Sequence, residues 1–264
     1  MGARAIWKSS LKIASETIPV KLYAAVEDRT VHFHVLEKST MSRITQHMVN
    51  PETGQEVLRD QTQWAYEAER GVYVRLTEED LEKAQPHDSR AIDILRFVPA
   101  SHIDQQWYDR PYYLGPDEND AGAYFALAEV LEREKREGIA RWVMRKKQYN
   151  GALRSEGGYL MLVTLKFAEE VLTAQDLPRP SGRTPDAKEL RMAEQLVSAL
   201  EDDFRPEDYH DEYRERVMKF IEAKAKGLKP RLRAVARRKE PKSLVASLAA
   251  SINMAKRGKV KAIA

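Results

Sequence analysis

Residues 159–165 read Tyr-Leu-Met-Leu-Val-Thr-Leu, a short and almost wholly apolar run. A run of this length is typical of a β-strand buried in a protein core. Further strands are expected where apolar and polar residues alternate, at residues 18–23, 31–35, 72–76, 91–97 and 139–144. Many short strands at this spacing favour an antiparallel sheet that closes or curls into a β-barrel.

Two helices are expected to interrupt the strands. Thr77 and Asp80 have the spacing of a capping box, with Asp in place of the usual Glu, so a short helix begins there. A second helix is expected from about residue 120 to Gly138, because apolar side chains recur at i, i+3 and i+7 on one face: Tyr124, Leu127 and Leu131. The predicted fold class is therefore α+β.

The stretch Leu-Pro-Arg-Pro-Ser-Gly at residues 177–182 marks a boundary, after which the pattern becomes helical. Thr184 is expected to cap one helix with Pro185 at its first position, and a second helix follows Pro206 and ends at Gly227. The two helices carry apolar stripes: Leu190, Ala193, Val197, Leu200 and Phe204, then Tyr209, Tyr213, Val217 and Ile221. These stripes need a surface to pack on, and a second subunit is a candidate.

Composition excludes several classes of protein. The chain of 264 residues has no cysteine, so it has neither disulfides nor a thiolate metal site. It also has no run of 18 apolar residues that could span a membrane, and its first residues lack the apolar core of a signal peptide. A cytoplasmic protein is the simplest expectation.

The net charge of +3 hides a strong asymmetry along the chain. Residues 224–264 hold 13 Lys or Arg and one acid, whereas residues 1–223 hold 31 basic and 40 acidic residues and sum to −9. A basic tail on an acidic body indicates a polyanionic partner, most often nucleic acid. The alternative is a flexible, solvated tail that serves solubility.

Basic residues in the body form two smaller groups. Arg141, Arg145, Lys146 and Lys147 flank and end one expected strand, and Lys38 and Arg43 bracket an expected hairpin tip. Cations in such places can contact phosphates without reading bases, although each can also be an ordinary surface charge. The full set of candidate DNA-binding residues is Lys8, Lys38, Arg43, Arg141, Arg145, Lys146, Lys147, Arg154, Arg237, Arg238, Lys239, Lys256, Arg257 and Lys259.

Catalytic signatures are absent from the sequence. His32 and His34 lie on one face of an expected strand, where two imidazoles can bind a metal, but no third ligand accompanies them. The acidic run Glu201-Asp202-Asp203 falls in helical sequence, where consecutive residues point in different directions. No phosphate-binding loop, dinucleotide fingerprint or nucleophile elbow occurs. We expect no catalytic residue, metal or cofactor.

Several of these segments, in this order, resemble the bacterial Ku proteins. The resemblance rests on residues 4–8 and 18–23, on 31–36, 71–74 and 92–98, on Trp107-Tyr108 with 112–117, and on 139–145, and it extends from about Arg4 to Leu172. The chain departs from the usual family pattern at residues 11–17 and 64–67, which leaves the local surface chemistry there open.

Membership of that family would imply three regions: a β-barrel core with a DNA-encircling strand bridge at residues 1–177, a helical arm at 183–228 and a basic tail at 229–264. It would also imply a homodimer closed into a ring that threads onto double-stranded DNA ends and recruits the bacterial ATP-dependent end-joining ligase. Two alternatives stay open from the residues alone. One is an architectural nucleic-acid binder that acts through its tail without need of ends, and the other is a DNA-processing enzyme such as a nuclease.

Overall fold

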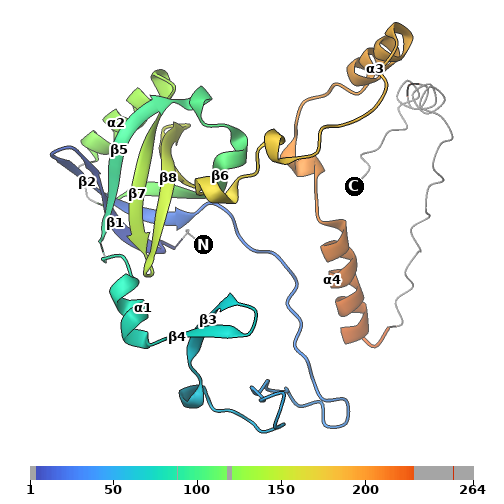
Figure 1. The fold of residues 1–264 in the computed structure, drawn as a ribbon. Helices are drawn as coiled ribbons and strands as arrows, with labels where there is room; N and C mark the ends of the chain where they lie inside the picture. Colours follow the sequence, from blue (N-terminus) through green and yellow to red (C-terminus); the bar gives the residue numbers. More distant parts are fainter. Residues whose placement is uncertain (1–3, 88, 118–120, 229–251, 253–264) are drawn as a thin grey trace. The chain divides into compact units, whose positions relative to one another are not determined.

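The computed structural model describes residues 4–87, 89–117, 121–228 and 252 of the chain. The chain divides into two compact units, residues 1–177 and residues 178–264. The first unit contains a β-barrel with one helix against it, a long segment between two barrel strands, and a short two-stranded sheet (Figure 1). The second unit contains two α-helices in its described part.

Seven strands form the closed barrel, in the spatial order β1-β2-β6-β9-β8-β7-β5. Their bounds are β1 Trp7–Ile13, β2 Glu16–Ala24, β5 Ala91–Pro99, β6 Tyr108–Pro116, β7 Arg136–Met144, β8 Lys147–Glu156 and β9 Tyr159–Leu165. The expected α+β fold with a β-barrel is confirmed. One detail was wrong, because the barrel is mixed and not purely antiparallel: β1 and β5 pair in parallel, with Ser10 opposite Ala91 and Lys12 opposite Asp93.

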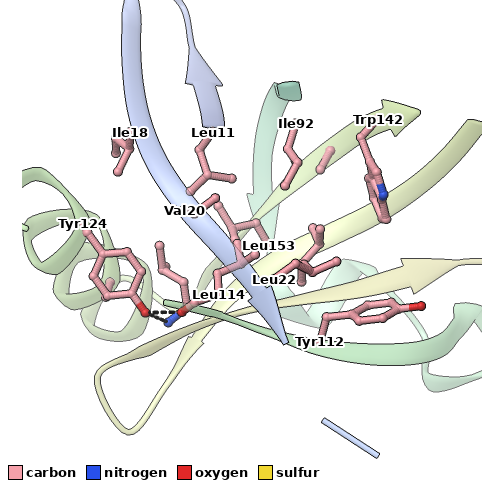
Figure 2. Close-up of a cluster of buried hydrophobic side chains, with 14 of the residues drawn as sticks. Leu11, Ile18, Val20, Leu22, Ile92, Tyr112, Leu114, Tyr124, Trp142 and Leu153 are labelled. Carbon is pink, nitrogen blue, oxygen red and sulfur yellow. Dashed lines mark hydrogen bonds between the residues drawn. The ribbon is translucent and has the colours of Figure 1, made fainter. Parts of the chain in front are cut away.

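The core fills the barrel with side chains from the inward positions of its strands. Leu11, Val20, Leu22 and Ile92 are fully buried there, together with Leu114, Leu153, Leu160 and Leu162 (Figure 2). The burial follows the period of two that the sequence shows, because successive residues of a strand point to opposite faces.

Helix α2 (Gly122–Arg133) closes one end of the barrel. The buried hydroxyl of Tyr124 donates to the carbonyl of Leu114 (2.6 Å) and accepts from the backbone N–H of Leu160 (2.9 Å), which ties the helix to β6 and β9 (Figure 2). The helix was expected to end at Gly138, but it ends at Arg133. Gly138 lies in β7, where a side chain would meet Phe97 and Ile94, and close packing is the reason for that glycine.

The opposite end of the barrel is filled by aromatic rings. Trp142 on β7 lies directly across from Tyr149 on β8, and the two rings stack with their centroids 5.5 Å apart. The Trp142 ring also passes over Gly151, where an added Cβ would come within 2.7 Å of both the ring and the carbonyl oxygen of Val163. Gly151 therefore provides the space that the tryptophan occupies.

The segment between β2 and β5 contains β3 (Trp64–Glu69), β4 (Val72–Leu76) and helix α1 (Glu78–Ala84). Thr77 and Asp80 form the expected capping box, with the Thr77 hydroxyl accepting from the Asp80 N–H at 3.1 Å. The strand expected at residues 31–35 was wrong: residues 25–63 have two isolated bridges, Leu36 with Arg43 and Val49 with Glu56, and no strand. Within the described part of the chain no strand pairs with residues 31–35, and the carbonyl of Val35 accepts from the N–H of Ile44 at 3.4 Å.

The second unit holds α3 (Ala187–Ala199) and α4 (Glu212–Ala225). The residue that caps α3 is Asp186 and not Thr184, and Pro185 precedes the helix. Glu189 completes the capping box. The carboxylate of Glu189 also pairs with Arg183, and this hydrogen bond is the main reason that the pKa of Glu189 is lowered to about 2. Helix α4 ends at Ala225, two residues before the expected Gly227. The positive φ of Gly227 turns the chain so that the N–H of Leu228 donates to the carbonyl of Ala223. Phe204 and the 201–203 acidic run lie outside α3, because that helix ends at Ala199.

Short 3-10 turns connect several of these elements. They are Arg59–Gln61, Ala100–His102, Gln105–Trp107, Ala168–Glu170, Ala174–Asp176 and Pro206–Asp208.

The contact between Gly151 and Trp142 predicts a large effect of a small substitution. We expect Gly151→Ala to lower the free energy of unfolding by about 1–3 kcal/mol, because the new methyl group must displace the Trp142 ring or the backbone of β9. Denaturant titration checks this, with Gly182→Ala as the control because a Cβ there meets nothing within 4 Å. An unchanged midpoint for Gly151→Ala would contradict the packing described here.

Candidate nucleic-acid interface

The hairpin of β7 and β8 brings four of the predicted cations together. Arg141 is exposed on β7, Arg145 and Lys146 form the two-residue turn, and Lys147 begins β8. The register fixes this arrangement, because Met144 pairs with Lys147 across the turn. We call these four residues the basic hairpin. It lies at the end of the barrel that the Trp142 and Tyr149 rings fill.

The turn of the basic hairpin has an unfavourable backbone for its residues. Arg145 and Lys146 both have positive φ, at 52° and 62°. A tight hairpin needs positive φ at both turn positions, and Asn-Gly or Gly-Gly normally supplies it. The next hairpin does so with Gly157 and Gly158. A non-glycine residue in this region costs about 1–2 kcal/mol, so the basic hairpin carries two cations where the backbone favours glycine.

Aromatic side chains lie beside these charges. The ammonium of Lys147 is 5.5 Å from the centroid of the Tyr149 ring, within the range of a cation–π contact. Burial raises the pKa of Tyr112, and the nearby charges of Arg110 and Arg145 oppose that rise. Arg110, whose guanidinium lies 5.9 Å from the Tyr112 ring, is therefore a fifth cation at this end of the barrel, and no pattern in the sequence indicated it.

Three other predicted residues lie elsewhere in the first unit. Lys8, on β1, pairs with the carboxylate of Asp117 at 3.4 Å. The pKa of Asp117 is lowered, mainly because Lys21 donates a hydrogen bond to the same carboxylate. Lys38 and Arg43 lie in the turn at residues 36–43, as expected, and Arg43 donates to the ring nitrogen Nε2 of His34 at 2.5 Å. Lys38 is exposed in that turn.

Arg154 does not join the basic hairpin, because it lies near the far end of β8. Its guanidinium packs 5.8 Å from the Tyr108 ring and 3.3 Å from the carboxylate of Glu156. The Tyr108 hydroxyl in turn donates to the buried Glu137 at 2.7 Å, and burial together with this hydrogen bond raises the pKa of Tyr108. These contacts give Arg154 a packing role.

The remaining predicted residues lie outside the described part of the chain: Arg237, Arg238, Lys239, Lys256, Arg257 and Lys259.

Within the described residues, no group of three or more His, Asp or Glu side chains is placed to hold a metal ion. The imidazole of His32 lies 3.8 Å from Asp28, and that of His34 accepts from Arg43. Nor is any described helix long and apolar enough to cross a membrane. The basic hairpin is the strongest candidate site, and its chemistry suits anionic oxygen atoms.

The fold and the hairpin define a class of protein: an α+β chain whose closed β-barrel presents cations at one end. Comparison with known proteins makes this specific. The family described as the Ku70/Ku80 beta-barrel domain matches residues 13–192. The non-homologous end joining protein Ku of Coxiella burnetii is 40% identical over 232 residues, which cover 86% of this chain and 84% of that protein.

Two further relatives have the same name. The protein of Anaeromyxobacter sp. is 38% identical over 226 residues, covering 85% of this chain and 76% of its own length. That of Pseudomonas aeruginosa is 34% identical over 226 residues, covering 84% and 77%. The chain belongs to the Ku family, and the expected resemblance is confirmed.

The strained turn allows stability and binding to be separated by one variant. We expect Arg145→Asn with Lys146→Gly to keep or raise the free energy of unfolding, by up to about 1 kcal/mol, because Asn-Gly suits the turn. The same variant should weaken DNA binding and make log K against log salt shallower, by about one unit for each lost phosphate contact.

Denaturant titration and fluorescence anisotropy on a duplex at several salt concentrations measure the two effects. A variant that removes two exposed cations from α3, Lys188→Gln with Arg191→Gln, controls for net charge. If the hairpin variant and the unmodified chain had the same DNA affinity and the same slope of log K against log salt, the basic hairpin would not be part of the DNA interface.

Proposed function

We propose that this protein binds double-stranded DNA ends as a homodimeric ring, without sequence preference, in double-strand break repair by non-homologous end joining. The observation that carries the proposal is the basic hairpin on a Ku-type barrel. Family membership supports the proposal. So do the relatives named as non-homologous end joining proteins, which this chain matches over most of their length.

The chemistry of the hairpin fits binding that ignores sequence. Four cations at a hairpin reach phosphates, which are the same at every step of a duplex, whereas base recognition needs donors and acceptors matched to base edges. In this proposal the protein is not an enzyme. It needs no cofactor, acts in the cytoplasm at the nucleoid, and recruits the bacterial ATP-dependent end-joining ligase.

The homodimer is supported by apolar surface that one chain leaves uncovered. The large apolar side chains that are exposed between β2 and α1 are Val26, Phe33, Val35, Leu36, Met41, Ile44, Met48, Val49, Leu58, Trp64, Tyr66, Val72, Tyr73 and Val74. This much apolar surface on one segment indicates an interface. We infer that a second copy covers it, and that residues 31–35 become a strand when that copy supplies a neighbour.

The proposed regions follow the expected bounds: barrel and bridge at 1–177, arm at 183–228 and basic tail at 229–264. Leu190 and Val197 on α3, with Met218 and Ile221 on α4, are exposed in a single chain. We propose that the arm packs these side chains against the dimer. The tail adds phosphate contacts but is not required for threading.

A comparison of DNA topologies tests the ring. We expect linear duplex to be bound and closed circles of the same sequence to be bound far more weakly, because a preformed ring must load at an end. Gel shifts on linear duplex, linear duplex with blocked ends and closed circles, at one stated salt concentration, make the measurement. Equal binding to circles would overturn the threading model.

A chain truncated at residue 228 separates the ring from the architectural alternative. If the ring is the main site, the truncated protein still prefers ends but has lower affinity and a shallower salt dependence, because 11 of the 13 basic residues in 224–264 are gone. Loss of end binding while the dimer persists would favour the tail-driven architectural binder.

Phe33 provides a direct test of the dimer, because its side chain is 66% exposed in a single chain. We expect Phe33→Asp to shift sedimentation from dimer to monomer at micromolar concentration, since a carboxylate would be buried in an apolar interface. Phe125→Asp is the control: it adds the same charge at an exposed phenylalanine on α2. A stable monomer of the unmodified chain would refute the homodimer.

A further inference from the structure

Strand β6 has an extra residue near its start. Its register against β9 shifts between Tyr108 and Pro111, so that Asp109 and Arg110 both lie opposite Thr164. Two residues opposite one make a β-bulge, and a bulge at the end of a barrel redirects the side chains that it carries. DNA binding by the basic hairpin alone would not require this bulge.

The hydroxyl of Thr164 contacts both residues of the bulge. Thr164 is buried on β9, and its oxygen accepts a hydrogen bond from the backbone N–H of Arg110 at 2.8 Å. The same hydroxyl can donate to the carboxylate of Asp109, at 3.2 Å, or to the carbonyl of Arg110, at 3.3 Å. One buried side chain therefore fixes the backbone of Arg110 and the side chain of Asp109.

The bulge places Arg110 at the end of the barrel where the basic hairpin lies. Its guanidinium is 5.9 Å from the centroid of the Tyr112 ring, within the range of a cation–π contact. Tyr112 and Trp142 lie at the same end of the buried cluster (Figure 2). Burial raises the pKa of Tyr112, and the charges of Arg110 and Arg145 both oppose that rise, so both guanidinium groups lie in electrostatic range of this ring.

The charge of Arg110 is available to a ligand. The side chain is exposed, and within the described residues no acid forms an ion pair with it. Asp109 is adjacent in the sequence, but its carboxylate takes part in the contact with Thr164. Arg154 differs, because it pairs with Glu156. An exposed guanidinium without an acidic partner can form two parallel hydrogen bonds with a phosphate.

We propose that Arg110 contacts a DNA phosphate beside the basic hairpin, and that Thr164 is the positioning residue that directs it there. The inference rests on the proposed function, because it adds a cation and its support to the same DNA interface. Thr164 is buried and touches no DNA. Removing its hydroxyl leaves the N–H of Arg110 without this acceptor and frees the Asp109 carboxylate to pair with the neighbouring guanidinium.

The full chain and a labelled linear duplex test the contact, by fluorescence anisotropy at several salt concentrations. We expect Arg110→Gln to lower the affinity about threefold to tenfold and to make the slope of log K against log salt shallower by about one unit. Thr164→Val keeps the shape and charge of the side chain but removes the hydroxyl, and it should produce nearly the same two changes. Thr164→Ser keeps the hydroxyl and should bind within about twofold of the unmodified chain.

Two further measurements separate positioning from a general structural role. Leu160→Val alters the core at the other end of β9 and should leave the salt slope unchanged, because Leu160 is fully buried near Tyr124. In a chain that already carries Arg110→Gln, Thr164→Val should have no further effect on DNA binding, since the contact that it supports is gone.

The results that would overturn the inference differ from those that would refute the proposed function. Normal affinity and slope for Arg110→Gln would overturn the inference alone, and this exposed substitution decides the matter even if Thr164→Val does not fold. An unchanged slope for a folded Thr164→Val, or a further loss of affinity in the Arg110→Gln background, would also overturn it. A full chain that bound no linear duplex would refute both the proposed function and this inference.

Discussion

The parallel pairing of β1 with β5 is the constraint on which the first unit depends. It closes the barrel through three register pairs, Ser10 to Lys12 with Ala91 to Asp93, and the Ser9 hydroxyl adds a bond to the carbonyl of Arg90. Parallel strands need a connection that returns the chain to the starting end, and β2, antiparallel to β1, makes that return. The chain then leaves the barrel after Ala24 and comes back as β5 at Ala91, beside the start of β1. The segment between β2 and β5 is therefore longer than closure of the barrel demands, and it carries the apolar surface assigned to the dimer.

Two consecutive hairpins of the barrel use the same tight turn for opposite chemistry. Gly157 and Gly158 supply positive φ in the β8–β9 turn without strain, and the flanking Glu156 and Tyr159 face each other. Arg145 and Lys146 adopt the same backbone against their preference. A stable hairpin alone would be better served by asparagine and glycine. The phosphate contacts proposed for these cations would explain their presence at this turn, and the strain is borne by a well-packed pair of strands.

Much of the barrel could be predicted from the sequence, because burial on one face leaves a period of two. Strands β1, β6 and β8 were not foreseen. In β8, Gly151 and the polar residues at 147–150 interrupt the apolar pattern, and the glycine is explained only by the Trp142 ring and the Val163 carbonyl of neighbouring strands. Residues 31–35 show the reverse error, since alternation predicts a strand but a strand also needs a neighbour. The cap of α3 was misplaced by two residues because both Thr184 and Asp186 can cap, and Glu189 decides between them.

The candidate site was foreseen as a group of charges but not as a geometry. Arg145, Lys146 and Lys147 are adjacent in the sequence, so their place at the end of a strand could be predicted. Arg110 comes near this group only because strands far apart in the sequence pair in the barrel. Arg154 is close to this group in sequence yet belongs to another part of the barrel, because β8 carries it away. Positive φ alone does not mark the proposed site, because Ala14, Met41 and Lys135 also have it. What sets the basic hairpin apart is that two adjacent cations share this backbone in one tight turn. Together with the exposed apolar side chains between β2 and α1, this turn is where the sequence departs most from what its own fold favours, and such departures are expected at sites where a partner acts.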